Sequence, residues 1–371
     1  MYSTLKYARP TIRRLKITKA HIVFKRMAAE KKLPIVTIFS EYPSICDEIK
    51  NVDATIPLQF VAVTNKQGLA FSVFDRQDPE ISETAMNRLK EAEILVSDPN
   101  LLSHIYQQLP HTKWVQSTWA GQDEFFKHLD YSKPLPEFSL CKLGQELAVP
   151  LGEYVIGRLI AHERRFYKCY EAQKAKIWGS KIVPYRLLSE LTIGILGVGD
   201  IGSQIAEYCK TFGMKVWGMV RRELPIEKRS CCVDRYCLTS ELPVLLSNCD
   251  VVCNVLPSTP KTIGFLSGDV LADAKEKKPI FINVGRGDVM DEASIIKAIR
   301  ENWISHAILD VQPIEPIPQE SPLWSMKEIT ISPHEAGLTF GKNVAAALTE
   351  NYWRYVRGEP LKYVVDMKAG Y

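Results

Sequence analysis

The stretch from Leu191 to Gly202 reads Leu-Thr-Ile-Gly-Ile-Leu-Gly-Val-Gly-Asp-Ile-Gly, an apolar run that ends in the glycine pattern GxGxxG. The run predicts a buried β-strand, and the segment that follows, 200–212, predicts a helix. Gly197 permits a tight turn, Gly199 lets the backbone approach a pyrophosphate, and Gly202 permits close packing of helix and strand. Because N–H groups at a helix start favour anions, we expect a dinucleotide to bind here.

The next expected strand, 215–220, ends in Val220-Arg221-Arg222. A protein that uses NAD commonly carries an acid at this point, where it binds the ribose hydroxyls. Two guanidinium groups instead match the charge and geometry of a 2′-phosphate, which favours NADP(H), with NAD(H) as the alternative. The same pair is also compatible with a solvated strand end that Glu223 partly neutralises.

Short apolar runs alternate with helical patterns on both sides of the glycine motif, which is typical of parallel α/β architecture. Before the motif, strands are expected at 35–39, 69–74, 94–97 and 113–116, and a linker helix at 151–176. After it, strands are expected at 215–220, 250–255, 279–284 and 305–310, and helices at 291–301 and 340–357. The sequence therefore predicts two domains: 33–148 with 340–371 for the substrate, and 149–339 for the nucleotide.

Charge is unevenly distributed along the 371 residues, whose formal net charge is +4. Residues 1–32 hold ten basic side chains and one acid, whereas residues 33–371 hold 37 basic and 42 acidic side chains. The mildly acidic body predicts no nucleic-acid partner, and no uncharged run is long enough for a membrane span. Nine scattered cysteines show neither a disulfide framework nor a zinc pattern, so no metal is expected.

The basic segment 1–32 is poor in acids and contains hydroxyl side chains, as mitochondrial transit peptides do. We therefore expect a mitochondrial address. The alternative is a leader upstream of a start at Met27, which would leave the protein cytoplasmic.

Polar side chains follow further apolar runs of the second expected domain. Arg286 stands between Gly285 and Gly287 after one run, and we expect these glycines to keep the backbone bare beside a ligand. A guanidinium group binds a carboxylate in a bidentate fork. The pattern therefore makes Arg286 a candidate for binding an acidic substrate.

Asp310 and Glu315 follow another apolar run, and His334 follows a third. The carboxyl ends of parallel strands meet at one edge of a sheet, where ligands bind, so these side chains are expected to converge on the nicotinamide. An imidazole exchanges protons near neutral pH, which makes His334 the candidate acid/base.

Together these motifs resemble the D-isomer-specific 2-hydroxyacid dehydrogenase family. The motifs that carry the resemblance are the GxGxxG pattern, Asn-Val-Gly-Arg-Gly at 283–287, Leu-Asp-Val at 309–311 with Glu-Pro at 315–316, Ser-Pro-Leu-Trp at 321–324 and Ser-Pro-His at 332–334. The resemblance covers roughly residues 33–371. The segment Trp-Val-Gln-Ser at 114–117, then Trp-Ala-Gly at 119–121, is most similar to the glyoxylate/hydroxypyruvate reductase branch.

The resemblance implies a fold of two Rossmann-like domains, a doubly wound nucleotide-binding domain inserted in a smaller flavodoxin-like substrate domain. It also implies that His334 is the acid/base and that Glu315 pairs with it, orienting the ring and favouring its charged form. Arg286 would bind the substrate carboxylate and polarise the keto oxygen. Backbone amides around Ala120 and Gly121 would hold the other side of that carboxylate, which places the site between the domains.

Further positions carry roles by resemblance. Asp310 would orient the nicotinamide amide. Trp119 and Trp324 either line the substrate pocket or pack in the core. One departure is Gln122, because the family commonly has an apolar residue before its acid. The residues expected to contact the cofactor are Gly197, Gly199, Asp200, Ile201, Gly202, Arg221, Arg222, Leu256, Pro257, Thr262, Val284, Gly285, Arg286, Asp310, His334 and Gly337; those expected to contact substrate are Trp119, Ala120, Gly121 and Arg286.

The first interpretation is therefore an NADPH-dependent reductase of small 2-keto acids such as glyoxylate or hydroxypyruvate, and the resemblance implies a homodimer. One alternative is an NAD-linked D-2-hydroxyacid dehydrogenase of the D-3-phosphoglycerate or D-lactate type. The other is a nucleotide-sensing scaffold similar to the C-terminal-binding-protein corepressors, which keep this fold.

Overall fold

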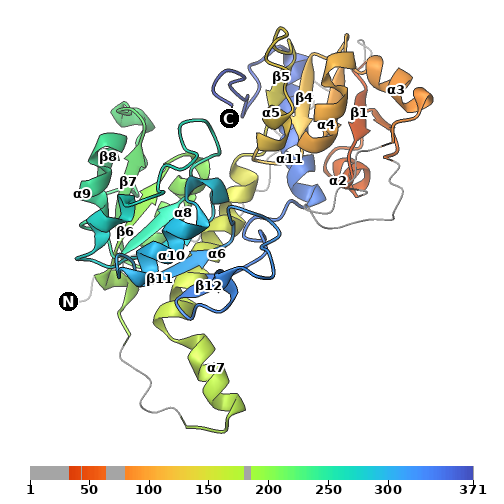
Figure 1. The fold of residues 1–371 in the computed structure, drawn as a ribbon. Helices are drawn as coiled ribbons and strands as arrows, with labels where there is room; N and C mark the ends of the chain where they lie inside the picture. The colour runs from red at the N-terminus through yellow and green to blue at the C-terminus, as the bar shows by residue number, and fades with distance from the viewer. Residues whose placement is uncertain (1–32, 43, 64–79, 179–184, 371) are drawn as a thin grey trace, which may run out of the picture.

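The computed structural model describes residues 33–42, 44–63, 80–178 and 185–370. Figure 1 shows two α/β lobes, one in red to yellow with a blue helix, the other in green to blue. The basic segment 1–32 and the strand expected at 69–74 lie outside the described residues. The predicted fold class, two α/β domains with parallel sheets, is confirmed.

The first lobe contains a five-stranded sheet of order β2-β1-β3-β4-β5 in which neighbouring strands are parallel. Its strands are β1 (Val36–Phe39), β2 (Leu58–Phe60), β3 (Ile94–Ser97), β4 (Trp114–Ser117) and β5 (Ser139–Cys141). Its helices include α2 (Ile45–Val52), α3 (Glu83–Lys90), α4 (Pro99–Ile105) and α5 (Asp123–Lys127). Every residue of β1, β3 and β4 is buried, which is why these strands read as continuous apolar runs.

The second lobe contains a seven-stranded parallel sheet of order β12-β11-β10-β9-β6-β7-β8. Its strands are β6 (Thr192–Leu196), β7 (Lys215–Val220), β8 (Arg235–Leu238), β9 (Val251–Asn254), β10 (Ile280–Asn283), β11 (His306–Leu309) and β12 (Ile329–Ile331). Its helices include α8 (Asp200–Thr211), α9 (Leu242–Leu246) and α10 (Glu292–Arg300). The chain runs outward from β6 to β8 and then returns to the other side of β6, so the strand order reverses beside β6. Ligands of such sheets bind at this reversal, outside the carboxyl ends of the strands.

Short 3₁₀ helices connect several of these elements. They span Tyr106–Gln108, Leu188–Glu190, Ile226–Lys228, Thr239–Glu241, Val270–Ala274, Gly287–Val289 and Pro322–Trp324. No helix of the described residues is long and apolar enough to cross a membrane. Among the same residues, no group of three metal-ligating side chains comes together.

The expectation of one linker helix at 151–176 is wrong in its bounds and its continuity. The structure has two helices, α6 (Gln145–Glu163) and α7 (Phe166–Lys174), separated at Arg165, whose φ of 55° is left-handed. Sequence periodicity does not reveal this break, because both halves keep helical spacing. Helix α6 packs on α8 and joins the lobes, whereas α7 has no buried residue and extends away from its lobe (Figure 1).

Helix α11 (Gly341–Arg357) returns the chain to the first lobe and packs against α2. Two of its aromatic side chains hold this position. The hydroxyl of Tyr352 donates to the carbonyl of Pro34 at 2.9 Å, and the Trp353 indole N–H donates to Asp53 at 3.0 Å. The second lobe therefore lies between β5 and α11 in the sequence, as an insertion does.

Candidate active site

The glycine turn between β6 and α8 leaves space where an anion is expected. Gly197 has a φ of 104°, in the left-handed region that favours glycine. A Cβ on Gly202 would lie 2.1 Å from the carbonyl oxygen of Gly197, so only glycine fits there. By contrast, a Cβ on Gly199 would meet nothing within 4 Å. The turn is therefore closely packed on its inner side and open at the start of α8, where Asp200 and Ile201 follow.

Arg221 and Arg222 stand beside this turn, directly after β7. The N–H of Gly197 donates to the carbonyl of Met219 at 3.1 Å, which fixes the turn against the end of that strand. Both arginines are exposed. They are thus at the same sheet edge as the open face of the turn, where the ribose of a dinucleotide is expected.

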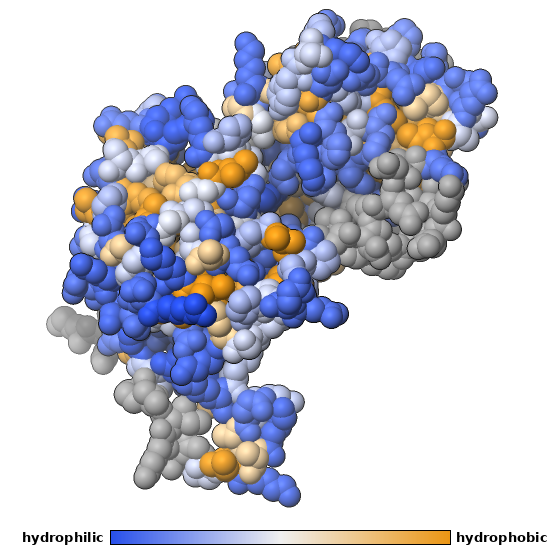
Figure 2. Space-filling model, viewed as in Figure 1, coloured by the Kyte–Doolittle hydropathy of each residue, from blue (hydrophilic) through white to orange (hydrophobic). Residues whose placement is uncertain are grey.

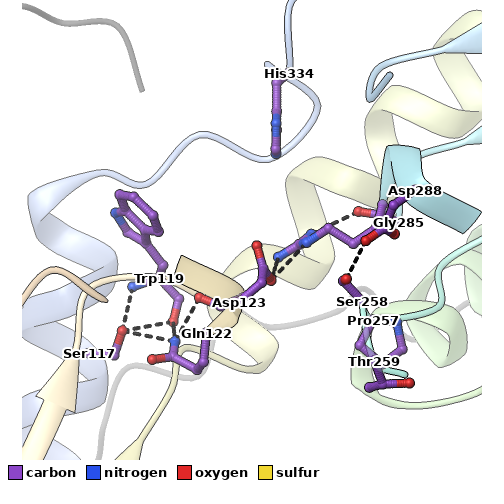
Figure 3. A network of polar contacts seen from close by, with 12 residues as sticks. Ser117, Trp119, Gln122, Asp123, Pro257, Ser258, Thr259, Gly285, Asp288 and His334 are labelled. Atoms are coloured by element: carbon purple, nitrogen blue, oxygen red, sulfur yellow. Dashed lines mark hydrogen bonds and ion pairs between the residues drawn. The ribbon is translucent and has the colours of Figure 1, made fainter. Parts of the chain in front are cut away.

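The segment expected to flank the cofactor at Leu256 and Pro257 forms a turn held by hydroxyl groups. The N–H of Thr259 donates to the hydroxyl of Thr262 at 2.9 Å, and that hydroxyl donates to the carbonyl of Pro257. Ser258 donates to the carboxylate of Asp288 (Figure 3). The hydroxyl of Thr262 thus stabilises the turn through its hydrogen bonds to backbone groups.

Glycine occupies the positions on either side of Arg286 for a different reason from the one expected. A Cβ on Gly285 would lie 2.8 Å from the carbonyl oxygen of Leu256, and one on Gly287 would lie 1.9 Å from that of Gln312. The space beside each is therefore filled by neighbouring backbone, and the interpretation that they leave the backbone bare beside a ligand is wrong. Val284, which precedes them, is buried.

Arg286 forms an ion pair across the two lobes. Its Nε and one terminal nitrogen each lie 2.9 Å from one carboxylate oxygen of Asp123, at the start of α5, and its other terminal nitrogen donates to the Gly285 carbonyl at 2.7 Å (Figure 3). Burial alone would raise the pKa of Asp123, but the guanidinium outweighs this effect and lowers it. The pKa of Arg286 is raised, because the attraction of Asp123 outweighs burial. Both groups are therefore held in their charged forms.

His334 is paired as expected with Glu315. Its Nδ1 lies 2.9 Å from one oxygen of Glu315, whose other oxygen accepts the N–H of Gln312 at 2.7 Å. Because an ionised carboxylate only accepts, Nδ1 carries the hydrogen and Nε2 is the nitrogen that can exchange a proton with a ligand. Figure 3 shows the ring extending from its loop toward the side of the site where Asp123 lies, and His334 is near enough to Asp123 to lower the pKa of that carboxyl group.

The loop that carries His334 is fixed by Asp310, which directly follows β11. The buried carboxylate accepts the Ser332 hydroxyl at 2.7 Å and the N–H groups of Glu335 and Ala336 at 3.0 Å each. The N–H of His334 donates to the Asp310 carbonyl at 2.8 Å, and His334 adopts a left-handed φ of 52°. Asp310 thus supports the backbone of the acid/base candidate, a role that the sequence did not indicate.

Residues on α6 contact the same loop. The hydroxyl of Tyr154 is hydrogen-bonded to Ser332, and a Cβ on Gly337 would lie 3.0 Å from the side chain of Leu151. In this contact Gly337 allows the loop to approach α6 closely. The helix that connects the lobes is therefore in direct contact with the loop of His334.

The segment Trp119-Ala120-Gly121 follows β4 and faces Arg286. A Cβ on Gly121 would lie 1.5 Å from a terminal nitrogen of Arg286, so the guanidinium lies directly against this glycine. Trp119 is half-buried. Trp324 is 57% exposed and donates its indole N–H to the Pro318 carbonyl, so the core-packing alternative is wrong for it.

Sequence reasoning missed two charged residues of this region. Asp123 entered the sequence analysis only as the acid that follows Gln122, and an acid two residues after Ala120-Gly121 was the signal available. Lys142 follows β5, at the edge where Asp200 and Arg286 come near. Burial lowers the pKa of Lys142, with Asp200 acting against the shift and Arg286 adding to it. A lone lysine after a short edge strand gave no signal in the sequence.

Comparison with known proteins identifies the family. Residues 156–336 match the model of the D-isomer-specific 2-hydroxyacid dehydrogenase NAD-binding domain. Glyoxylate/hydroxypyruvate reductase A of Klebsiella pneumoniae is 31% identical over 264 residues, which cover 70% of this chain and 82% of that protein.

Solved structures agree with this match. A D-isomer-specific 2-hydroxyacid dehydrogenase family protein from Aeromonas salmonicida is 28% identical with a TM-score of 0.72, and the match covers 91% of this chain and all of that one. A D-isomer-specific 2-hydroxyacid dehydrogenase from Xanthobacter autotrophicus, solved with NADPH and MES, is 25% identical with a TM-score of 0.74, and the match covers 92% of this chain and all of that one.

The chain belongs to the D-isomer-specific 2-hydroxyacid dehydrogenases, a family of oxidoreductases, and within it to the glyoxylate/hydroxypyruvate reductase A branch. The resemblance found in the sequence motifs is thereby confirmed.

Proposed function

We propose that this protein reduces small 2-keto acids, such as glyoxylate or hydroxypyruvate, to D-2-hydroxy acids with NADPH as the hydride donor. One observation carries the proposal: Arg286 of the nucleotide lobe lies against Gly121 of the other lobe and is paired with Asp123, whose pKa is also lowered by the nearby His334 that Glu315 holds. An anion-binding fork and a proton donor therefore face the same space between the lobes. That combination suits a substrate with a carboxylate next to a carbonyl group.

The proposed roles follow from the chemistry of each group. Arg286 binds the carboxylate and polarises the keto oxygen, and the amides near Ala120 and Gly121 hold the other carboxylate oxygen. Nε2 of His334 donates the proton that the developing alkoxide needs as the hydride reaches C2. Glu315 stabilises the charged imidazolium before that proton is transferred.

The proposed preference for NADPH rests on two features. Arg221 and Arg222 follow β7, where an acid would select the unphosphorylated ribose. The structurally similar Xanthobacter autotrophicus enzyme was solved with NADPH. The open face at Gly199, at the start of α8, fits the pyrophosphate of either cofactor, so NAD(H) remains a weaker donor in this proposal.

A steady-state panel tests this function. Purified protein is assayed with glyoxylate, hydroxypyruvate, pyruvate and 3-phosphohydroxypyruvate, each with NADPH and with NADH. We expect the first two keto acids with NADPH to give the highest kcat/KM, and His334→Ala and Arg286→Ala to abolish most of it. Absence of turnover with every short 2-keto acid would overturn the proposal and favour a nucleotide-sensing scaffold.

We also propose that the protein is a homodimer that associates through α7 and the described residues that follow it, 175–178 and 185–187. This region carries a set of large apolar side chains that are about half exposed or more, and Trp178 is 92% exposed. They are Phe166, Tyr167, Tyr170, Ile177, Trp178, Tyr185 and Leu187. Figure 2 shows apolar atoms at this lower end of the molecule, where Figure 1 places α7. A group of exposed large apolar side chains in one part of the molecule is typical of an interaction surface.

Light scattering during size-exclusion chromatography tests the dimer. The wild-type protein is expected to have the mass of two chains, and Tyr170→Ser with Trp178→Ser is expected to shift it toward one. A monomeric wild type would contradict the proposal.

For localisation, we propose that segment 1–32 directs the protein to mitochondria, because its charge of +9 suits a transit peptide. Sequencing the mature N-terminus of the protein isolated from cell fractions tests this. A cytoplasmic protein that begins at Met1 or Met27 would contradict it.

A further inference from the structure

Gln122 is a buried polar side chain at a position where the family commonly has an apolar residue. It is only 2% exposed and stands between the substrate segment, which ends at Gly121, and the first residue of α5, Asp123. Its Nε2 lies 2.9 Å from the Ser117 hydroxyl, 3.0 Å from the Trp119 carbonyl and 2.9 Å from the Gly121 carbonyl (Figure 3). The two amide hydrogens are therefore shared among three acceptors of one loop.

These contacts determine which atom of the Gln122 side-chain amide is the nitrogen and which is the oxygen. Two of the acceptors are carbonyl oxygens, and a carbonyl accepts only from a donor, so the nitrogen must face the loop. The Oε1 of Gln122 is buried and has no hydrogen-bond partner among the described residues. Leaving a buried acceptor unpaired costs free energy that an apolar side chain would avoid. What a glutamine adds over an apolar side chain here is therefore the set of hydrogen bonds that its Nε2 donates to the loop.

The orientation of the loop does explain it. The peptide bonds between Trp119 and Ala120 and between Gly121 and Gln122 are trans, so each N–H points opposite to its carbonyl. Because both carbonyls turn toward the Gln122 side chain, the N–H groups of Ala120 and Gln122 turn away from it. Within the part of the chain that the structure describes, neither N–H donates to another protein group.

The Ser117 hydroxyl completes this arrangement. It accepts the N–H of Trp119 at 3.1 Å as well as the amide of Gln122, and it lies at the end of β4, where the sheet fixes it. The loop is thus tied to the sheet at its start and to Gln122 at its end. The turn held in this way is the one that the guanidinium of Arg286 covers at Gly121.

We propose that Gln122 is a positioning residue for the substrate carboxylate: its side-chain amide draws in the carbonyls of Trp119 and Gly121, so that the N–H groups of Ala120 and Gln122 face the anion held by Arg286. This inference rests on the proposed reduction of a 2-keto acid. The Trp119 carbonyl also accepts the N–H of Leu143 at 3.0 Å, whereas the Gly121 carbonyl accepts from no other group of the described residues. An apolar residue at 122 fills the same space but leaves the Gly121 carbonyl without this donor.

The test substitutes Gln122→Met, which keeps the volume and removes the donor. We expect the KM of the keto acid and the inhibition constant of oxalate, a carboxylate that competes with it, to rise about tenfold each. The rise in KM should be larger than the change in kcat, and the Kd of NADPH should stay within twofold. A merely structural role would move the cofactor affinity and the melting temperature together with the KM.

Gln116→Met is the matched control, because Gln116 is a fully buried glutamine of β4 whose amide donates to the backbone carbonyls of Ser117 and Cys141 and not to those of Trp119 or Gly121. It should leave the inhibition constant of oxalate within twofold. If Gln122→Met does not fold, Ser117→Ala removes one of its acceptors and should raise the KM about threefold.

The outcomes separate the two proposals. An active wild type whose KM and oxalate inhibition are unchanged in Gln122→Met, or in Ser117→Ala where the former does not fold, overturns the role of Gln122 alone. A wild type without turnover on any keto acid overturns the proposed function, and this inference with it.

Discussion

Asp123 and Arg286 join the two lobes through a pair of 2.9 Å contacts to one carboxylate oxygen. The contacts occupy the side of the guanidinium formed by Nε and one terminal nitrogen. Of the three other hydrogens, one donates to the Gly285 carbonyl, which leaves one on each terminal nitrogen. A substrate carboxylate can bind these two hydrogens in a second fork. Since one partner belongs to each lobe, the pair forms only when the lobes are close together. Domain closure and the orientation of Arg286 are thereby linked.

Asp123→Asn tests this link. The amide keeps the shape but loses the charge, so Arg286 is held less firmly and the keto acid binds more weakly. We expect the KM of the keto acid to rise about tenfold while the Kd of NADPH changes less than threefold. Glu124→Gln is the matched control, because Glu124 is the neighbouring carboxylate and pairs with Lys127 instead. A lower KM in Asp123→Asn would show that Asp123 competes with the substrate.

Much of the fold follows from the sequence, because strands buried on both faces read as apolar runs. The strand expected at 94–97 matches β3, and the one at 113–116 is displaced from β4 by one residue. The edge strands β2 and β5 have three residues each, too few to form such a run. In β8 one residue of four is buried, so its pattern gave no signal either.

The candidate site was predictable where a motif fixes both residue and spacing, as for the glycine turn and the pairing of His334 with Glu315. Contacts between the lobes were not predictable. Asp123 and Arg286 are 163 positions apart in the sequence, and no local pattern links them. The same limit explains why the contacts of Asp310 were not predicted, since its carboxylate binds backbone groups that only the folded loop brings to it. Its contact with the nicotinamide stays a prediction.

Substitution of two glycines in the turn between β6 and α8 should affect cofactor binding in one case and stability in the other. Gly199→Ala adds a methyl group to open space, so the melting temperature should not change, but the Kd of NADPH should rise at least about tenfold as the methyl meets the pyrophosphate. Gly202→Ala adds its methyl group 2.1 Å from a backbone oxygen and should destabilise the fold by about 1–3 kcal/mol. Thermal melting and cofactor fluorescence measure both. Equal effects of the two substitutions on stability would contradict the assignment of the open face.

The cofactor preference should reside in Arg221 and Arg222. Replacing both by alanine removes the charges proposed to bind the 2′-phosphate, so kcat/KM with NADPH should fall roughly 100-fold, while the value with NADH stays within threefold. Lys228→Ala, a nearby exposed cation, is the control for a general effect of charge. If the double variant keeps its ratio of NADPH to NADH activity, these arginines do not select the cofactor.

Glu315 should contribute to kcat through His334. In Glu315→Gln the ring keeps a hydrogen-bond acceptor at Nδ1 but loses the negative charge that stabilises the imidazolium, so kcat should fall roughly 10- to 100-fold. Glu335→Gln changes an exposed carboxylate beside the histidine and should leave kcat within twofold. Similar losses in both variants would point to a general electrostatic effect instead of the 2.9 Å pair.

A half-buried histidine pair should make the fold sensitive to acid. His306, on β11, lies 4.4 Å between ring centroids from His162 of α6, and its Nε2 is hydrogen-bonded to the Thr330 hydroxyl. Burial, reinforced by the charge of His162, lowers the pKa of His306 to about 3, whereas in the unfolded chain the pKa is about 6.5. Between pH 6.5 and pH 3 the unfolded state binds a proton at His306 that the folded state does not bind. The free energy of unfolding is therefore unaffected by His306 above pH 6.5 and decreases as the pH falls toward 3.

Urea unfolding at pH 7.5 and pH 5.0 measures this contribution. His306→Gln keeps a polar side chain beside Thr330 but does not titrate, so the variant should lose about 1–2 kcal/mol less stability than the wild type between the two pH values. His111→Gln is the control, because His111 is exposed and its replacement should leave the pH dependence unchanged. If His306→Gln loses as much stability on acidification as the wild type, His306 is protonated in the folded protein at pH 5, and the pair is not the source of acid sensitivity.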